Sequence, residues 1–173
     1  MNIQLEKYGV VNLVNYTDLT EEESQLVLAM RNHPEIMKWM YHSDEILLSE
    51  HHNFIEGLKK DSSRYYFLVK QNDLILGSIN FLDLKNINHE VVFGLYANPY
   101  VSIAGIGRIL EEASIFYASN KLQAKVLKLE VYSENKQVMN LHKKYGFNIS
   151  GRKEVNDKEV LCMQKNYIEQ ESV

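Results

Sequence analysis

The sequence contains only one cysteine, Cys162, so no disulfide can form within the chain. Because disulfides are typical of oxidising compartments, this scarcity favours a reducing cytoplasm. No apolar run approaches the roughly 20 residues that span a membrane. The first residues show neither an apolar signal core nor a cleavage-site pattern. We therefore expect a cytoplasmic protein without a membrane partner.

Basic residues are not in excess either. Lys and Arg number 19 against 23 Asp and Glu, which gives a formal net charge of −4. A protein that binds nucleic acid regardless of sequence normally needs a basic face, so we expect no nucleic-acid partner. A small anionic ligand stays open, because a few backbone amides in one loop can bind it without a basic surface.

Signals for linkers, repeats and metal sites are also missing. Two prolines and eight glycines interrupt the 173 residues, and no Gly/Ser linker or low-complexity tract is present. We expect a single domain over residues 1–168 and a short polar tail over 169–173. The histidines and Cys162 lack the spacing of metal ligands, so no metal is expected.

Periodicity and turn residues predict an α+β fold. Thr20 and Glu23 form a capping box that starts a helix. Three strands follow as an antiparallel meander, and a later strand–helix–strand crossover requires a parallel pair in the same sheet. Helices are expected at 21–31, 34–40, 49–60, from 105 onward and at 135–145, with Ser49 as a cap. Strands are expected at 10–16, 64–71, 74–83, 89–96, 125–132, 147–154 and 158–165.

The most informative segment joins a predicted strand to the long helix. Gly105 and Gly107 leave backbone amides uncovered at the helix start, where the positive end of the helix dipole favours an anion. A dinucleotide fingerprint would need a third glycine at the position of Leu110. From spacing alone, an anion site and a simple glycine-rich cap remain equally open.

The order of elements and two motifs resemble the GCN5-related N-acetyltransferase (GNAT) family over about residues 10–166. The loop from Ser102 to Gly107 is similar to the family's Gln/Arg-x-x-Gly-x-Gly/Ala, with Ser in place of the first residue. The second motif is similar to Asn-x-x-Ala-x-x-Leu-Tyr-x-Lys-x-Gly-Phe. In this chain it comprises Asn135, Val138, Leu141, His142, Lys144, Gly146 and Phe147. His142 thus stands where the family often has a catalytic tyrosine.

Within that family the chain most resembles the bacterial N-acetyltransferases of pseudaminic acid biosynthesis. Those enzymes acetylate the 4-amino group of a UDP-linked 4-amino-4,6-dideoxy sugar that is used to glycosylate flagellin. The similar segments are Arg31–Pro34, Lys38–Tyr41, Leu76–Ile79, Gly94–Tyr96 and Leu129–Val131.

The resemblance implies a mixed, mostly antiparallel sheet with helices on both faces and a splayed parallel strand pair. It implies acetyl-CoA as the acetyl donor, bound where these two strands separate, with its pyrophosphate on the amides of the glycine loop. The implied cofactor-binding residues are Leu95, Tyr96, Ile103, Ala104, Gly105, Ile106, Gly107, Arg108 and Asn135.

The resemblance also implies catalytic roles. Glu130 is the candidate base, and we expect partial burial to raise its pKa into a useful range. His142 is the candidate acid that protonates the leaving CoA thiolate, and Tyr145 is the rival donor. Non-catalytic roles stay open for all three residues. Glu130 could be a surface carboxylate, His142 a histidine of the core, and Tyr145 a packing residue.

Ser78 and Asn80 form a polar pair that alternation places on the same strand face as Leu74, Leu76 and Leu82. We expect this pair to face a wet cleft, with Ser78 among the catalytic residues. The implied acceptor-binding residues are Arg31, His33, Trp39, Met40, Tyr41 and Asn80.

Two other functions remain open at this stage. The acceptor amine could be a protein N-terminus or another small amine, or the domain could bind CoA for regulation without catalysis. The sequence also leaves open whether two copies form a homodimer.

Overall fold

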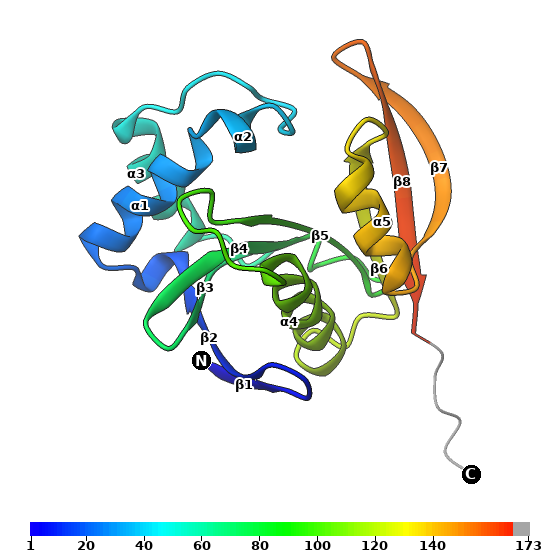
Figure 1. The fold of residues 1–173 in the computed structure, drawn as a ribbon, viewed down its shortest axis with the longest axis horizontal. Helices are drawn as coiled ribbons and strands as arrows, with labels where there is room; N and C mark the ends of the chain where they lie inside the picture. The colour runs from blue at the N-terminus through cyan, green and yellow to red at the C-terminus, as the bar shows by residue number, and fades with distance from the viewer. Residues whose placement is uncertain (168–173) are drawn as a thin grey trace.

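The computed structural model describes residues 1–167, which fold into an α+β domain around one eight-stranded sheet (Figure 1). The predicted tail over 169–173 lies outside the described residues. In chain order the elements are β1 Asn2–Leu5, β2 Gly9–Asn15, η1 Tyr16–Asp18, α1 Glu21–Arg31, α2 Pro34–Met37, α3 Leu48–Leu58, β3 Tyr65–Gln71, β4 Leu74–Leu82, β5 Glu90–Ala97, α4 Ile106–Asn120, β6 Val126–Tyr132, α5 Lys136–Lys144, β7 Asn148–Val155 and β8 Lys158–Asn166.

The sheet has the order β1-β2-β3-β4-β5-β6-β8-β7. Its strand pairs are antiparallel except for β5 and β6, which are parallel because α4 crosses between them. The predicted fold class, with its antiparallel meander and one parallel pair, is confirmed.

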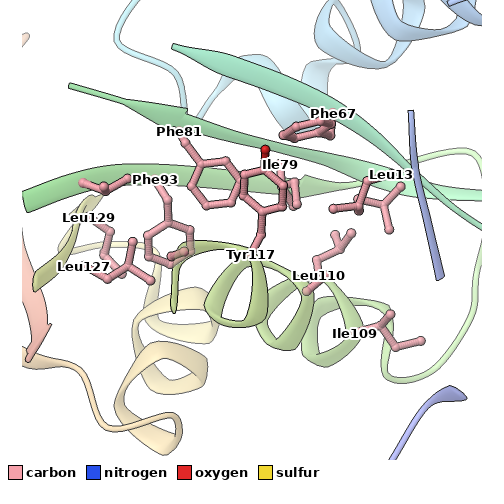
Figure 2. Close-up of a cluster of buried hydrophobic side chains, with 14 of the residues drawn as sticks. Leu13, Phe67, Ile79, Phe81, Phe93, Ile109, Leu110, Tyr117, Leu127 and Leu129 are labelled. Atoms are coloured by element: carbon pink, nitrogen blue, oxygen red, sulfur yellow. The ribbon is translucent and has the colours of Figure 1, made fainter. Parts of the chain in front are cut away.

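Helices cover both faces of the sheet (Figure 1). The larger core lies between the sheet and the helices α4 and α5. At its centre the ring of Tyr117 stacks on Phe81 at 5.0 Å and contacts Phe67 at 4.9 Å between centroids (Figure 2). A smaller core on the opposite face joins Val27 and Met30 of α1 to Leu68 of β3.

The helix starts show where sequence signals were sufficient. The capping box of α1 is confirmed, since Thr20 Oγ1 accepts from the Glu23 amide and Glu23 Oε2 accepts from the Thr20 amide. The expectation that Ser49 caps the third helix is wrong. Leu47 is the cap residue, and the carboxylate of Glu50 accepts its amide hydrogen at 2.7 Å. The short strand β1 was not predicted.

One face assignment in β4 is wrong. Val69 pairs with Gly77 while Lys70 pairs with Ile75, so Leu76 is an extra residue in a β-bulge. A bulge reverses the alternation of side chains along a strand. Leu76 therefore packs in the larger core, whereas Ser78 points to the opposite face.

Candidate active site

A cavity of about 1470 Å³ opens between the glycine loop, the ends of β5 and β6, and the segment that contains α1 to α3. Cavities for small molecules usually measure about 300–1,000 Å³. This one therefore has room for two ligands side by side.

The strands β5 and β6 separate inside this cavity. Their parallel pairing ends at Val92 and Lys128, although β5 continues to Ala97 and β6 to Tyr132. Backbone groups on the facing edges beyond this point are free for a ligand. Leu95 and Tyr96 of β5 line the gap.

The glycine loop supplies the amides that the sequence predicted. Gly105 precedes α4 with φ of +88°, a conformation that favours glycine. The first amides of a helix have no partner within the helix, so those at the start of α4 can bind an anion. The whole predicted loop, from Ile103 to Arg108, lines the cavity.

Two further features adjoin this loop. A Cβ atom at Gly107 would lie 3.3 Å from Leu141 Cδ2, so α5 packs closely here. Asn135 lines the cavity and also caps α5, because its Oδ1 accepts from the Val138 amide at 3.4 Å. The structure thus brings the predicted cofactor residues together at one end of the cavity.

Glu130 lines the cavity from β6, but its carboxylate is already engaged. Tyr41 Oη donates to Oε2 at 2.5 Å, and Lys153 Nζ donates to Oε1 at 2.7 Å. Burial raises the pKa of Glu130, but these two donors outweigh burial and hold the pKa below its ordinary value. The expected raised pKa is wrong, because the sequence did not show that a cation would stand beside this carboxylate.

His142 and Tyr145 occupy different surroundings. His142 lines the cavity, is 4% exposed, and lies edge-on to Phe93 and Phe147. Tyr145 lies outside the cavity lining, where its hydroxyl donates to Glu112 Oε1 at 3.0 Å. Of the two proposed donors, the structure places only His142 at the site.

Ser78 belongs to a buried group of hydroxyls at the floor of the cavity. Its Oγ lies 2.6 Å from Tyr16 Oη, which lies 3.4 Å from Tyr96 Oη. Burial is the largest cause that raises the pKa of Tyr16 and of Tyr96, so both phenols stay protonated. Asn80 follows on the same face and also lines the cavity.

The other end of the cavity is lined by Arg31, Trp39 and Met40, three of the residues that we expect to bind the acceptor. Arg31 Nη2 donates to the carbonyl of His42 at 2.9 Å, whereas Nη1 is buried without a hydrogen-bond partner among the described residues. Burial lowers the pKa of this guanidinium, which nevertheless stays charged.

Two predicted acceptor residues lie beside the cavity and do not line it. His33 caps α2, because its Nδ1 accepts from the Glu35 amide at 3.2 Å. Tyr41 instead contacts the site through Glu130. A histidine followed by proline is also a helix-start pattern, and that local role is the one the structure shows for His33.

Sequence reasoning missed several aromatic residues of the lining, among them Tyr16, Tyr66 and His51. Tyr16 was assigned to the end of a strand, while Tyr66 and His51 were left without a role. His51 Nε2 lies 3.0 Å from the carbonyl of Ser24, and burial lowers the pKa of this imidazole. Nothing local in the sequence shows that these residues meet, because they come from separate elements.

Within residues 1–167 no group of three His, Cys, Asp or Glu side chains is arranged to hold a metal ion. In the same part of the chain, no helix is both long and apolar enough to cross a membrane.

Comparison with known sequences finds the acetyltransferase (GNAT) domain over residues 14–148. Two curated relatives are named acetyltransferase PseH. One, from Campylobacter jejuni serotype O:23/36, is 36% identical over 81% of this chain and 86% of its own length. The other, from C. jejuni serotype O:2, is 32% identical over 91% of this chain and 96% of its own length.

Solved structures of N-acetyltransferases are also similar to this chain. The crystal structure of C. jejuni N-acetyltransferase PseH in complex with acetyl coenzyme A superposes with a TM-score of 0.70 at 30% identity, over 90% of this chain and 98% of that one. A spermidine N-acetyltransferase from Vibrio cholerae reaches a TM-score of 0.81 over 90% of this chain and 95% of that one. At 18% identity, this second likeness shows the fold alone.

Proposed function

Because the chain belongs to the GNAT acetyltransferase family, we propose that it acetylates the 4-amino group of a UDP-linked 4-amino-4,6-dideoxy sugar of the N-acetylaltrosamine type. The chain is an N-acetyltransferase that uses acetyl-CoA. The proposed product is an intermediate of pseudaminic acid biosynthesis for flagellin glycosylation. Identity of 32–36% to two PseH acetyltransferases supports this assignment over other acceptors.

The observation that carries the proposal is the single cavity with two chemically different ends. The loop of Gly105 and Gly107 provides amides for a pyrophosphate at one end. At the other end, Arg31 lies among aromatic side chains. Glu130 and His142 line the stretch between the ends, so both substrates can meet there before the acetyl group moves.

The acceptor end suits a sugar nucleotide. The buried Nη1 of Arg31 has no partner among the described residues, and a planar guanidinium favours phosphate oxygens. Trp39 and Met40 offer apolar surface to a uracil ring and to the methyl group of a 6-deoxy sugar. The hydroxyls of Ser78 and Tyr96 can hydrogen-bond the sugar.

Two residues are proposed to move protons during direct transfer. Acetyl-CoA supplies an acetyl group on a leaving thiol when it is bound. Glu130 is ionised throughout the neutral range, so it attracts the acceptor ammonium and takes its proton, directly or through water. His142 holds a proton at Nε2 for the departing sulfur. The amine itself is the nucleophile, so no covalent acetyl-enzyme is needed.

This assignment also bears on location. UDP-sugars and acetyl-CoA meet in the bacterial cytoplasm, and a free thiol at Cys162 is compatible with a reducing compartment. We therefore propose that the protein works in the cytoplasm.

Mass spectrometry of candidate acceptors tests the proposal. The protein is incubated with acetyl-CoA and a UDP-4-amino-4,6-dideoxy sugar, and we expect a product heavier by one acetyl group. Matched acceptors are the corresponding 4-hydroxy sugar nucleotide, a polyamine and a peptide with a free N-terminus. Acetylation of the peptide or polyamine in preference to the amino sugar would contradict the proposed acceptor. Binding of acetyl-CoA without turnover of any amine would indicate a regulatory domain.

A further inference from the structure

A second carboxylate lies behind the catalytic histidine, and the sequence analysis gave it no role. Glu111 of α4 places Oε1 at 2.9 Å from Nδ1 of His142. The two side chains are 0% and 5% exposed. They form a buried acid–imidazole pair between α4 and α5.

Packing alone is a poor reason for a glutamate at this place. Removing a carboxylate from water is costly unless its oxygens are hydrogen-bonded. Only one carboxylate oxygen of Glu111 has a hydrogen-bond partner, since Oε2 is buried without one among the described residues. An apolar residue of similar volume would avoid this cost, so the carboxylate has a role that concerns His142.

The geometry connects Glu111 to the cavity through the imidazole alone. His142 lines the cavity, whereas Glu111 does not. Because Nδ1 faces Glu111, the opposite edge of the ring with Nε2 is left for the cavity. Nε2 has no hydrogen-bond partner among residues 1–167. Phe93 and Phe147 contact the ring at centroid distances of 5.8 and 5.7 Å and restrict its rotation.

We propose that Glu111 is a positioning residue that fixes the orientation of His142 and stabilises its cationic form, so that Nε2 presents a proton to the cavity. This inference rests on the proposed role of His142 in acetyl transfer. A carboxylate that accepts from one ring nitrogen determines which nitrogen faces the substrate and favours imidazolium.

The acceptor nitrogen forms a bond to the acetyl carbon, and the carbon–sulfur bond breaks with its electron pair on sulfur. His142 gives its Nε2 proton to that sulfur and becomes neutral, while Nδ1 keeps its hydrogen bond to Glu111. The proton lost by the acceptor amine passes to Glu130 or water.

Other titratable groups surround this pair. Burial and the charge of Glu111 raise the pKa of Tyr167, which follows β8, to about 12. On the same two helices, Glu112 pairs with Tyr145 next to the Glu111–His142 pair. Lys143 and Lys144 are exposed beside His142 on α5. Phe93 of β5 and Phe147, just before β7, contribute no charge to the pair.

Glu112 gives a matched control for a variant of Glu111. Glu111→Gln keeps the side-chain shape and removes the charge, and Glu112→Gln does the same one position later. Turnover of the amino sugar is measured from pH 6 to 10. For Glu111→Gln we expect kcat to fall at least about 10-fold at neutral pH, with its alkaline limb moved to lower pH. The KM for acetyl-CoA should not change, and Glu112→Gln should follow the wild type.

Two further measurements separate positioning from structural support. If Glu111 acts through His142, Glu111→Gln should lower kcat no further in a His142→Gln background, and Glu111→Asp should restore part of the activity. An NMR titration of the His142 ring needs no acceptor substrate. The ring should lose its proton at lower pH in Glu111→Gln than in the wild type.

The NMR titration keeps this inference separate from the proposed function. An unchanged titration curve in folded Glu111→Gln would overturn the inference, as would an unchanged pH profile or additive losses in the double variant. If Glu111→Gln does not fold, the neutral variant Glu111→Met is titrated instead, and the same criterion applies. If no amine is acetylated, the proposed function fails while the titration still tests the pair.

Discussion

Both carboxylate oxygens of Glu130 accept hydrogen bonds, one from Tyr41 and one from Lys153. We propose two separable roles for Glu130. The carboxylate can take a proton from the acceptor, and it can also hold Tyr41 beside the cavity. Variants of Glu130 and of Tyr41 distinguish these two roles.

We predict that Glu130→Gln lowers kcat by about 10²-fold, within the range for general base catalysis. Affinity for acetyl-CoA, measured by calorimetry, should stay near the wild-type value because the carboxylate has no proposed contact with the cofactor. Tyr41→Phe removes the same hydrogen bond from the other side and leaves the charge in place. Equal losses of kcat in the two variants would show that Glu130 acts by holding Tyr41.

At the scale of single residues, the sequence predicted side chains that lie in recognisable motifs and missed those that depend on a distant partner. Glu130 and His142 were identified through their places in a strand and a helix motif. Glu111 was not, because its partner is 31 positions away. A signal for it existed nonetheless, since Gly107, Ser114 and Ala118 form a second face of α4 around Glu111 that is suited to packing against another helix.

Among the elements, the start of α4 is the proposed binding site of the acetyl-CoA pyrophosphate. We predict that Gly107→Val weakens acetyl-CoA affinity at least about 10-fold while circular dichroism shows an intact fold. The added side chain would crowd Leu141 and shield the amides at the helix start. Gly57→Val in α3 is the matched control, because a Cβ at Gly57 meets no atom within 4 Å. An unchanged affinity in folded Gly107→Val would remove the loop from the cofactor site.

The start of α1 carries a prediction about stability and pH. Glu23 accepts from Lys70 Nζ at 2.7 Å and from the Thr20 amide at 3.0 Å. The hydrogen bond from Lys70 is the largest cause that lowers the pKa of Glu23. A lowered pKa in the folded state stabilises the fold above the unfolded pKa, and this contribution is lost as pH falls through the folded pKa.

Glu23→Gln should therefore reduce the free energy of unfolding by about 1 kcal/mol at pH 7. The difference from the wild type should shrink as pH falls below the ordinary glutamate pKa of about 4.3 and through the lower pKa of the folded state, because the carboxylate then becomes protonated. Urea denaturation at several pH values measures the difference in free energy of unfolding between the variant and the wild type. Glu22→Gln, on the exposed side of the same turn, should show no such dependence. A pH-independent difference for Glu23→Gln would mean that only the cap geometry matters.

At this scale, local signals predicted most helices and strands, and non-local packing accounts for the errors. Thr20 and Glu23 sufficed for α1 because a capping box involves only neighbouring residues. The bulge at Leu76 could not be predicted, because it is defined by register against β3. The close approach of Tyr96 explains why the next residue is glycine, since a Cβ at Gly77 would lie 2.3 Å from the Tyr96 carbonyl oxygen.

Across the whole molecule, two segments that are distant in the sequence meet beside the cavity. The connection between α2 and α3 reaches toward β7 and β8 (Figure 1). Asn156 Nδ2, in the β7–β8 turn, donates to the Tyr41 carbonyl at 2.7 Å and to Tyr132 Oη at 3.3 Å. The ring of Tyr41 lies edge-on to Tyr132 at 5.6 Å. This contact holds the connection between α2 and α3 against the end of the sheet.

We predict that Asn156→Gly raises the KM for the acceptor several-fold and leaves acetyl-CoA affinity unchanged. Glycine tolerates the positive φ of 52° that Asn156 adopts and removes the side chain with its donor amide. Limited proteolysis should also cut residues 38–47 faster, because the connection loses its anchor. Asp157→Gly, at the next turn position with φ of 59°, is the control. Equal KM values in the two variants would contradict an anchoring role.

Trp39, the single tryptophan of the chain, lies in the cavity lining at the proposed acceptor end. Its ring also has Lys38 Nζ at 5.4 Å from the centroid. Indole emission depends on solvent and nearby charge, so the intrinsic fluorescence of the unlabelled protein originates largely at one end of one cavity. If the acceptor binds at this end, as we propose, its occupancy can be followed optically, separately from that of acetyl-CoA and without waiting for turnover.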